Sequence, residues 1–384
     1  MTDAISGVQE LLGRLPTRVV YGPGTLSELG QVVASYGAGR IFLVSDRGLV
    51  NAGHVERAVG SLEQAGLHVV PFVDVVENPD SNTVHRALPA AEFARIDFIV
   101  GLGGGSVMDC AKGINLILTN GGTVRDYWGI NKAVKPMLPS VLIPTTAGTG
   151  SEAQSFALIS DPSTHRKMAC GDKRPPGGGG LRPLVAILDP DLTFTAPKSV
   201  TAAVGMDAIA HAVETAATTK KTPGSLVFTT AAWNLLDQAF PRVLRSPDDP
   251  SARMQMLLGA HLAGAAIEQS MLGAAHACAN PLTACHGIVH GQAVGLMLPH
   301  VIRFNIAAGE NPYAALGLDG QTLATRIEEL LISAALPTRL KDLKIPAISL
   351  TDLSDRAAME WTAGFNSRPV GPGEILALYR LAYG

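Results

Sequence analysis

The sequence predicts two domains, an α/β domain with a mostly parallel sheet followed by an all-helical domain. Its 384 residues, 47% of them apolar, exceed the size at which one hydrophobic core stops growing. Short apolar runs alternate with helical patterns in the first half, as is typical of a sheet covered on both faces by helices. After residue 194, strand patterns nearly vanish and Ala-, Leu- and Met-rich helical runs dominate. We therefore expect domains at 1–194 and 195–384.

The first domain begins with TRVVYG, where apolar residues alternate at the strand period, and a glycine- and proline-containing turn then leads into a helical run. The same succession recurs along the domain. It predicts strands at 17–22, 40–46, 68–76, 97–103, 140–144 and 184–190, and helices at 26–37, 51–65, 83–94 and 107–119. Lys173–Pro183 holds prolines and four glycines and is expected to be an exposed or mobile loop. Pro197 is expected in the first turn of the helix that opens the second domain.

The charge and cysteine patterns indicate which partners and which cellular compartment to expect. The 30 basic and 33 acidic residues give a formal charge of −3, without a basic tract, so nucleic acid and anionic membranes are not expected partners. We find no apolar run long enough to span a bilayer and no secretion-signal order at the N-terminus. The four cysteines form no CxxC pair and are expected to be buried thiols in a reducing cytoplasm: Cys110, Cys170, Cys278 and Cys285.

A triple glycine marks the first candidate binding loop. The strand predicted at 97–103 runs into GGGS, Gly103 to Ser106, and then into a helical run. Glycines between a strand and a helix N-terminus let backbone N–H groups approach a phosphate, and the helix dipole favours the anion. The loop therefore predicts phosphate binding, with a plain tight turn as the alternative.

Two further features favour a nucleotide. The usual dinucleotide fingerprint has an acid about 20 residues after the glycines, but here the acid comes earlier, at Asp46, which ends an apolar run. A carboxylate there would accept the ribose hydroxyls and repel a 2′-phosphate, favouring NAD over NADP; the alternative is a polar strand terminus. A second loop, Thr145 to Glu152, has glycines and hydroxyls suited to the rim of a nucleotide pocket, although these hydroxyls also suit helix caps.

The run AVGMDAIAHAVET in the second half predicts a metal site. Asp207 and His211 are four residues apart, so a helix places them on one face, one turn apart. A later segment contains further candidate ligands: His276, His286, His290 and His300. Each of these alone is more often a core or surface histidine. Burying Asp207 in so apolar a stretch is costly without a cation or a hydrogen-bonded partner, which favours a metal held by both segments.

Four motifs in order, GGGS-x-x-D, PTTAGTGSE, GMDAIAHAVE and the HACANPLTA to VHG segment, resemble the iron-containing (group III) alcohol dehydrogenase family over nearly the whole chain. The resemblance implies a dehydroquinate synthase-like fold. It implies a metal held by Asp207, His211, His276 and His290. It also implies a nucleotide cradle at Gly104, Gly105 and Ser106, ribose contact by Asp46, and further nucleotide contacts from Asn78, Thr145, Thr146, Thr149 and Lys167.

The sequence departs from the family at one position. Many members carry a further histidine one turn after the third ligand, where it is proposed to help move the proton, but this chain has Asn280. An amide can orient an alcohol by a hydrogen bond, but it does not titrate near neutral pH. The proton would then pass through water, the nicotinamide ribose or His286, if that side chain faces the pocket.

The resemblance implies a cytoplasmic NAD-dependent enzyme that transfers a hydride between NAD(H) and a small alcohol or aldehyde. The family name indicates Fe(II), whereas the ligand set suits Zn(II) at least as well. The VVYGPG strand is expected to add to a partner's sheet edge in a homodimer. Three alternatives remain: a metal-independent reductase of the maleylacetate type, a lyase of the dehydroquinate synthase type, and a sensor that binds NADH without catalysis.

Overall fold

The computed structural model describes residues 2–164 and 166–384. The chain divides into two units. The first unit contains the residues through Thr146 together with Gly150–Thr195, and the second contains Ala147–Thr149 and Ala196–Gly384. The main division thus lies one residue after the expected boundary, and a short piece of the second glycine loop belongs to the second unit.

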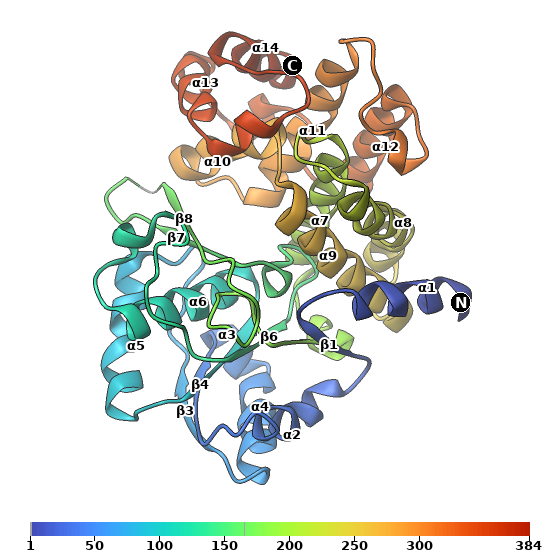
Figure 1. Cartoon of the computed structure of the whole chain (residues 1–384). Coiled ribbons are helices and arrows are strands. Elements are labelled where there is room, and N and C mark those ends of the chain that lie inside the picture. The colour runs from blue at the N-terminus through green and yellow to red at the C-terminus, as the bar shows by residue number, and fades with distance from the viewer. Residues whose placement is uncertain (1, 165) are drawn as a thin grey trace. The chain divides into compact units, whose positions relative to one another are not determined.

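A six-stranded parallel sheet organises the first unit (Figure 1). All six expected strands form, although the third ends at Phe72 rather than Val76. In sheet order the strands are β1 (Arg18–Tyr21), β9 (Val185–Leu188), β6 (Ser140–Pro144), β4 (Phe98–Gly103), β2 (Arg40–Val44) and β3 (His68–Phe72). The inner strands are apolar almost throughout because both faces of a parallel sheet are covered.

Helices cover this sheet on both faces and form two cores. Along β2, Ile41 and Leu43 belong to one core, while Phe42 and Val44 belong to the other, as the side-chain alternation of a strand requires. The helices are α1 (Thr2–Gly13), α2 (Leu29–Ala34), α3 (Arg47–Asn51), α4 (His54–Gln64), α5 (Ser81–Phe93) and α6 (Gly105–Asn120), with 3₁₀ helices η1 (Thr25–Glu28), η2 (Val124–Tyr127), η3 (Ser151–Ala153) and η4 (Pro190–Thr193). The helix expected at 51–65 begins only at His54, because Gly53 has a left-handed φ of 77°.

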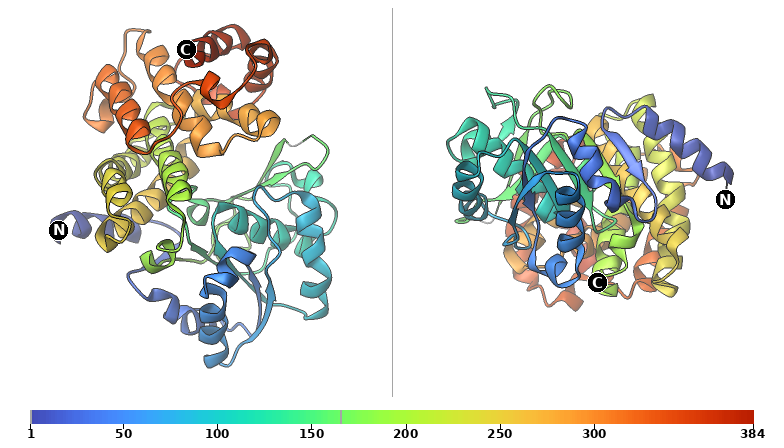
Figure 2. Two further views of the ribbon diagram at one scale, coloured as in Figure 1. Left: turned by 180° about the vertical axis from the view of Figure 1, so that it is seen from behind. Right: turned by 90° about the horizontal axis from the view of Figure 1, so that it is seen from below.

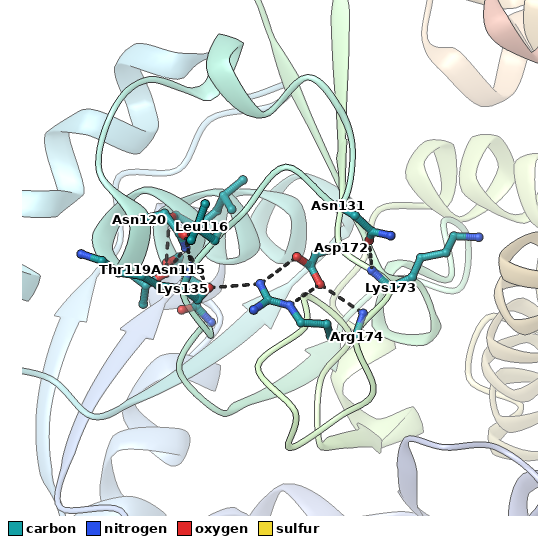
Figure 3. Close-up of polar contacts among 10 residues, drawn as sticks. Asn115, Leu116, Thr119, Asn120, Asn131, Lys135, Asp172, Lys173 and Arg174 are labelled. Carbon is teal, nitrogen blue, oxygen red and sulfur yellow. Dashed lines mark hydrogen bonds and ion pairs between the residues drawn. The ribbon is translucent and has the colours of Figure 1, made fainter.

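A smaller sheet, absent from the sequence prediction, joins β5 (Gly129–Ile130), β8 (Lys167–Gly171) and β7 (Phe156–Ser160) in that order. Strands β7 and β8 pair antiparallel. The loop at 173–183 has no regular helix or strand, as expected, but it is not exposed throughout. Leu181 is buried, and the Arg174 guanidinium donates to both carboxylate oxygens of Asp172 and to the Lys135 carbonyl (Figure 3). The expectation of an exposed loop is therefore wrong for Arg174, which is half-buried, and for Leu181, which is buried.

The second unit is helical, and strands are absent from its residues 147–149 and 196–384. Its long helix α7 (Lys198–Ala217) is buried over most of its length and packs against α8, α9 and α11 (Figures 1 and 2). Pro197 is the N-cap residue just before it. The other helices are α8 (Pro223–Arg245), α9 (Pro250–Ser270), α10 (Ala274–His286), α11 (His290–Ile306), α12 (Gly320–Ser333), α13 (Leu350–Ala358) and α14 (Pro372–Tyr383), with 3₁₀ helices η5 (Ala314–Leu316), η6 (Leu340–Leu343), η7 (Ala347–Ser349) and η8 (Trp361–Phe365).

Glycines bring α7 close to its neighbours. A Cβ at Gly291, in the first turn of α11, would lie 1.9 Å from the Ala203 carbonyl oxygen on α7. A Cβ at Gly205 on α7 would lie 2.5 Å from the Phe240 ring on α8. These positions have no room for a side chain, so the start of α11 is held directly against α7.

The cysteines are all free. Three are buried, as expected, but Cys285 is exposed because it lies in the last turn of α10.

None of the helices in the described part of the chain combines the length and apolar character that crossing a membrane requires.

Candidate metal and nucleotide sites

The second unit brings together the four residues that the resemblance implies as metal ligands. Asp207 and His211 lie one turn apart on α7, His276 lies in the first turn of α10, and His290 begins α11. The Nε2 atoms of the three histidines lie 3.5, 3.5 and 3.7 Å, in that order, from Asp207 Oδ1. Ligand atoms about 2.0–2.1 Å from one ion lie roughly 3.3–3.4 Å apart in a tetrahedral site, so each histidine lies near metal-site distance from Asp207. The ligand atoms of Asp207, His276 and His290 all lie within 4.8 Å of one another, and His211 falls outside this closer group.

Among the buried atoms of the described residues that have no hydrogen-bond partner are Asp207 Oδ1 and His276 Nε2. Both side chains are nearly inaccessible, with Asp207 5% and His276 4% exposed. A buried carboxylate oxygen without a partner is costly. A divalent cation among these atoms would remove that cost, so the residues fit the metal that the resemblance implies.

The charges in the cluster are strongly coupled. Burial alone would raise the pKa of Asp207, but the neighbouring histidines, His211 first, hold it well below its usual range. Burial lowers the pKa of His211. Burial would also lower the pKa of His276, but the carboxylates of Glu214 and Asp207 raise it to about 9. Because metal ligands bind deprotonated, a metal at this cluster would displace the proton from His276 Nε2.

Glu214 is a member of this cluster that the sequence reasoning missed. It lies on α7, three residues after His211, and its Oε2 is 2.5 Å from His276 Nδ1. The run GMDAIAHAVE could have indicated this residue, because Glu214 lies seven positions after Asp207 and two helical turns bring both to one face.

The first glycine loop leaves β4 at Gly103, and Gly104 is the N-cap of α6. The loop is closely packed: a Cβ at Gly104 would lie 3.3 Å from Thr146 Oγ1. Ser106 Oγ accepts a hydrogen bond from the Asn78 backbone N–H at 3.1 Å. The fold thus brings Gly104, Gly105, Ser106, Asn78 and Thr146 to one helix N-terminus, the arrangement that favours a phosphate.

Asp46 follows β2, which pairs in parallel with β4, so the acid and the glycine loop both lie at the carboxyl ends of the strands. Nucleotides bind at this end of the sheet in α/β folds. Its Oδ1 accepts from the Leu49 backbone N–H at 3.0 Å. Asp46 therefore caps α3, a structural role other than the polar strand terminus weighed for it in the sequence.

The other residues implied as nucleotide contacts are spread over several elements. Thr145 is buried, and its backbone N–H bonds the Gly103 carbonyl. Thr149 belongs to the second unit, where a Cβ at the neighbouring Gly148 would lie 2.7 Å from Val204 on α7. Lys167 begins β8, and its charge lowers the pKa of Asp109 on α6, although burial of that carboxyl raises it more.

Asn280 lies on α10, one turn after His276. Its Nδ2 donates to Glu360 Oε2 at 2.9 Å. His286 is the last residue of the same helix, about 15 Å along the helix axis from His276 at 1.5 Å per residue. Asn280 is thus positioned near the ligands, whereas His286 is remote from them along the helix.

Comparison with known proteins decides the family. The family model described as iron-containing alcohol dehydrogenase matches residues 16–190, and the model for the C-terminal part of the same family matches residues 201–383. The chain belongs to the iron-containing alcohol dehydrogenase family. The resemblance stated from the motifs is confirmed, and as a member of this family the chain is an alcohol oxidoreductase.

Individual family relatives match along almost the whole chain. Alcohol dehydrogenase 4 of Schizosaccharomyces pombe is 32% identical over 96% of this chain and 88% of its own. The crystal structure of a 1,3-propanediol oxidoreductase has a TM-score of 0.89 at 30% identity and covers 95% of this chain and 97% of its own. A sulfoacetaldehyde reductase from Bifidobacterium kashiwanohense, solved in complex with NAD+, has a TM-score of 0.86 at 27% identity, with 96% and 97% covered. These structures confirm the predicted fold class.

Proposed function

We propose that this family member transfers a hydride between NAD(H), bound by residues 1–194, and a small alcohol or aldehyde, bound at a divalent metal held by residues 195–384. The observation that carries the proposal is the convergence of three histidine Nε2 atoms on Asp207 Oδ1, a buried oxygen without a hydrogen-bond partner in the described chain. Family membership supports the reaction class.

The nucleotide is assigned to the carboxyl ends of strands β2 and β4 in the six-stranded sheet. Backbone N–H groups at Gly104, Gly105 and Ser106 would bind the pyrophosphate, and Asp46 would accept from the ribose hydroxyls. Further contacts are assigned to Asn78, Thr145, Thr146, Thr149 and Lys167. The NAD+ complex of the sulfoacetaldehyde reductase supports NAD as the cofactor.

The metal is assigned to Asp207, His211, His276 and His290. When bound, the metal supplies a Lewis acid for the substrate oxygen and NAD+ supplies the hydride acceptor. We assign Fe(II) on the family description, with Zn(II) as the alternative that the same nitrogen and oxygen ligands accept. The protein's part is to hold Asp207, His276 and His290 close together, with His211 one helical turn from Asp207, in a largely buried cluster.

Asn280 is assigned to orient the alcohol. One of its N–H groups is used by Glu360, which fixes the amide plane and leaves the amide oxygen to accept from the alcohol O–H. The proton then passes to water, to the nicotinamide ribose or to His286. The position of His286 at the far end of α10 favours the first two.

We further propose a cytoplasmic homodimer. In the described part of the chain β1 pairs with β9 alone and forms one edge of the six-stranded sheet. An edge strand carries backbone groups that can pair with a strand of a second copy. The measurement that tests this is the mass of the purified protein in solution, for which a monomeric mass would contradict the dimer.

The function is tested by metal analysis of the purified protein together with NADH oxidation against a panel of aldehydes. We expect about one metal ion per chain and aldehyde-dependent NADH oxidation that stops when a chelator removes the metal. Full activity without metal would favour the maleylacetate-type reductase. NADH binding without turnover of any aldehyde would favour the sensor.

A further inference from the structure

Glu214 uses both of its carboxylate oxygens on two consecutive residues of α10. Oε1 accepts from the Ala275 backbone N–H at 2.6 Å, and Oε2 lies 2.5 Å from His276 Nδ1. The side chain is 3% exposed, so these contacts lie away from water. Glu214 comes from α7, the helix that also carries Asp207 and His211.

The first of these contacts, with the Ala275 N–H, caps the N-terminus of α10. The N-cap residue of this helix, Gly273, provides no side-chain cap, so its first N–H groups need partners from elsewhere. Ala274 N–H donates to Asn366 Oδ1 at 3.3 Å, and Ala275 N–H donates to Glu214. A Cβ at Gly273 would lie 3.0 Å from Asn366 Oδ1 and 3.1 Å from Glu214 Oε1. The backbone that carries His276 is therefore fixed from two sides, and a negative charge at a helix N-terminus is favourable.

The second contact determines which nitrogen of His276 is available as a ligand. An ionised carboxylate only accepts hydrogen bonds, so His276 Nδ1 carries the hydrogen. The other nitrogen, Nε2, lies 3.5 Å from Asp207 Oδ1, on the side where the metal ligands converge. A metal-binding imidazole needs its ligating nitrogen free of hydrogen, and the partner of its other nitrogen fixes both tautomer and ring orientation.

We infer that Glu214 is a positioning residue of the metal site: it sets His276 in the Nδ1–H tautomer, fixes its ring, and so strengthens metal binding without contacting the metal. This inference rests on the proposed metal site. It adds a fifth residue to the metal machinery, one that joins the α7 ligands to the α10 ligand through a single carboxylate.

The test compares Glu214→Gln with Asn366→Ala in the metal-stripped full chain, using Co(II) as the probe in competition with a chelator. Glu214→Gln can place its amide in two orientations. If the amide oxygen accepts from the Ala275 N–H, the NH₂ group faces the N–H of His276 Nδ1; if the amide is flipped, the NH₂ group faces the Ala275 N–H. One contact is lost either way. Asn366→Ala removes the cap on Ala274, together with the hydrogen bonds of Asn366 to Asn305 and to the Arg368 carbonyl, and leaves the partner of His276 in place. Circular dichroism and thermal unfolding of the metal-free variants check that each is folded.

We expect Glu214→Gln to bind Co(II) about 10- to 100-fold more weakly, and Asn366→Ala to bind it about as tightly as the unaltered protein while unfolding at a lower temperature. Unchanged affinity in Glu214→Gln, or an equal loss in Asn366→Ala, overturns the inference. Should Glu214→Gln fail to fold, Glu214→Asp keeps the charge but is one methylene short of both contacts. A folded Glu214→Asp with unchanged affinity also overturns it. If the unaltered protein binds no Co(II), the proposed metal site itself fails.

Discussion

The ammonium of Lys112 donates to Ser151 at both its side chain and its backbone, with Nζ 2.8 Å from Oγ and 2.6 Å from the carbonyl oxygen. Lys112 lies on α6, which begins at the first glycine loop, and Ser151 begins η3 at the end of the second. Lys112 also donates to the carbonyls of Gln154 and Phe156. A single buried cation thus holds together two segments that we assign to the nucleotide.

We predict that Lys112→Met destabilises the protein by several kcal/mol, because Ser151, Gln154 and Phe156 lose a charged donor and a hydrogen bond to a charged group contributes about 1.5–3 kcal/mol. Urea unfolding measures this change. Lys135→Met is the matched control, since the Lys135 side chain is exposed. Equal unfolding midpoints for the two variants would contradict a stabilising role for the Lys112 network.

Much of the first unit was predictable because local patterns agree with the final fold. β2, β4 and β6 are short apolar runs in the sequence, and burial on both faces of a parallel sheet requires that composition. The sheet of β5, β8 and β7 was missed. Its β8 is the short run KMACG, which begins at the last residue of the charged segment HRK. Its pairing with β7 depends on tertiary contacts that do not appear in the local sequence pattern.

The candidate metal cluster was predictable only in part. The spacing of Asp207 and His211 places both on one face of a helix, but periodicity did not choose among the four histidines downstream. The family motif made that choice. Glu214 was missed because its partner, His276, is 62 residues further along the chain. Cys285 was expected to be buried, but its position in the last turn of α10 exposes it.

The cofactor preference should change at Asp46. We predict that Asp46→Gly relaxes the preference for NADH toward NADPH, because the carboxylate that would repel a 2′-phosphate is gone. The measurement is the ratio of kcat/KM for the two cofactors. Asp46→Ser separates this effect from helix capping, since a serine hydroxyl also caps α3. An unchanged ratio in both variants would mean that Asp46 does not meet the ribose.

Loss of one metal ligand should remove metal and activity together. We predict that His276→Ala and His290→Ala purify with almost no metal and no aldehyde-dependent NADH oxidation, because three ligands would remain where the cluster provides four. Metal content per chain and activity are measured on the same sample. His300→Ala is the control, since His300 shares α11 with His290 but is not among the proposed ligands. A ligand variant that keeps both metal and activity would exclude that residue from the site.

The proton path is the remaining question, and Asn280 is where it can be tested. An amide does not titrate near neutral pH, so we predict that Asn280→His adds an ionisation near pH 6.5, the ordinary pKa of histidine, to the pH profile of kcat/KM. Asn280→Ala is the control: it should lower the rate without adding an ionisation, because it removes the group that orients the alcohol and provides no group that titrates.

His286→Ala tests the alternative path on the same assay. Because about 15 Å of helix axis separates His286 from His276 at 1.5 Å per residue, we expect its pH profile to match that of the unaltered protein. A matching profile makes His286 a structural residue and leaves water or the nicotinamide ribose as the carrier. Loss of an ionisation in His286→Ala would instead identify His286 as the proton carrier and require a chain of bridging groups along α10.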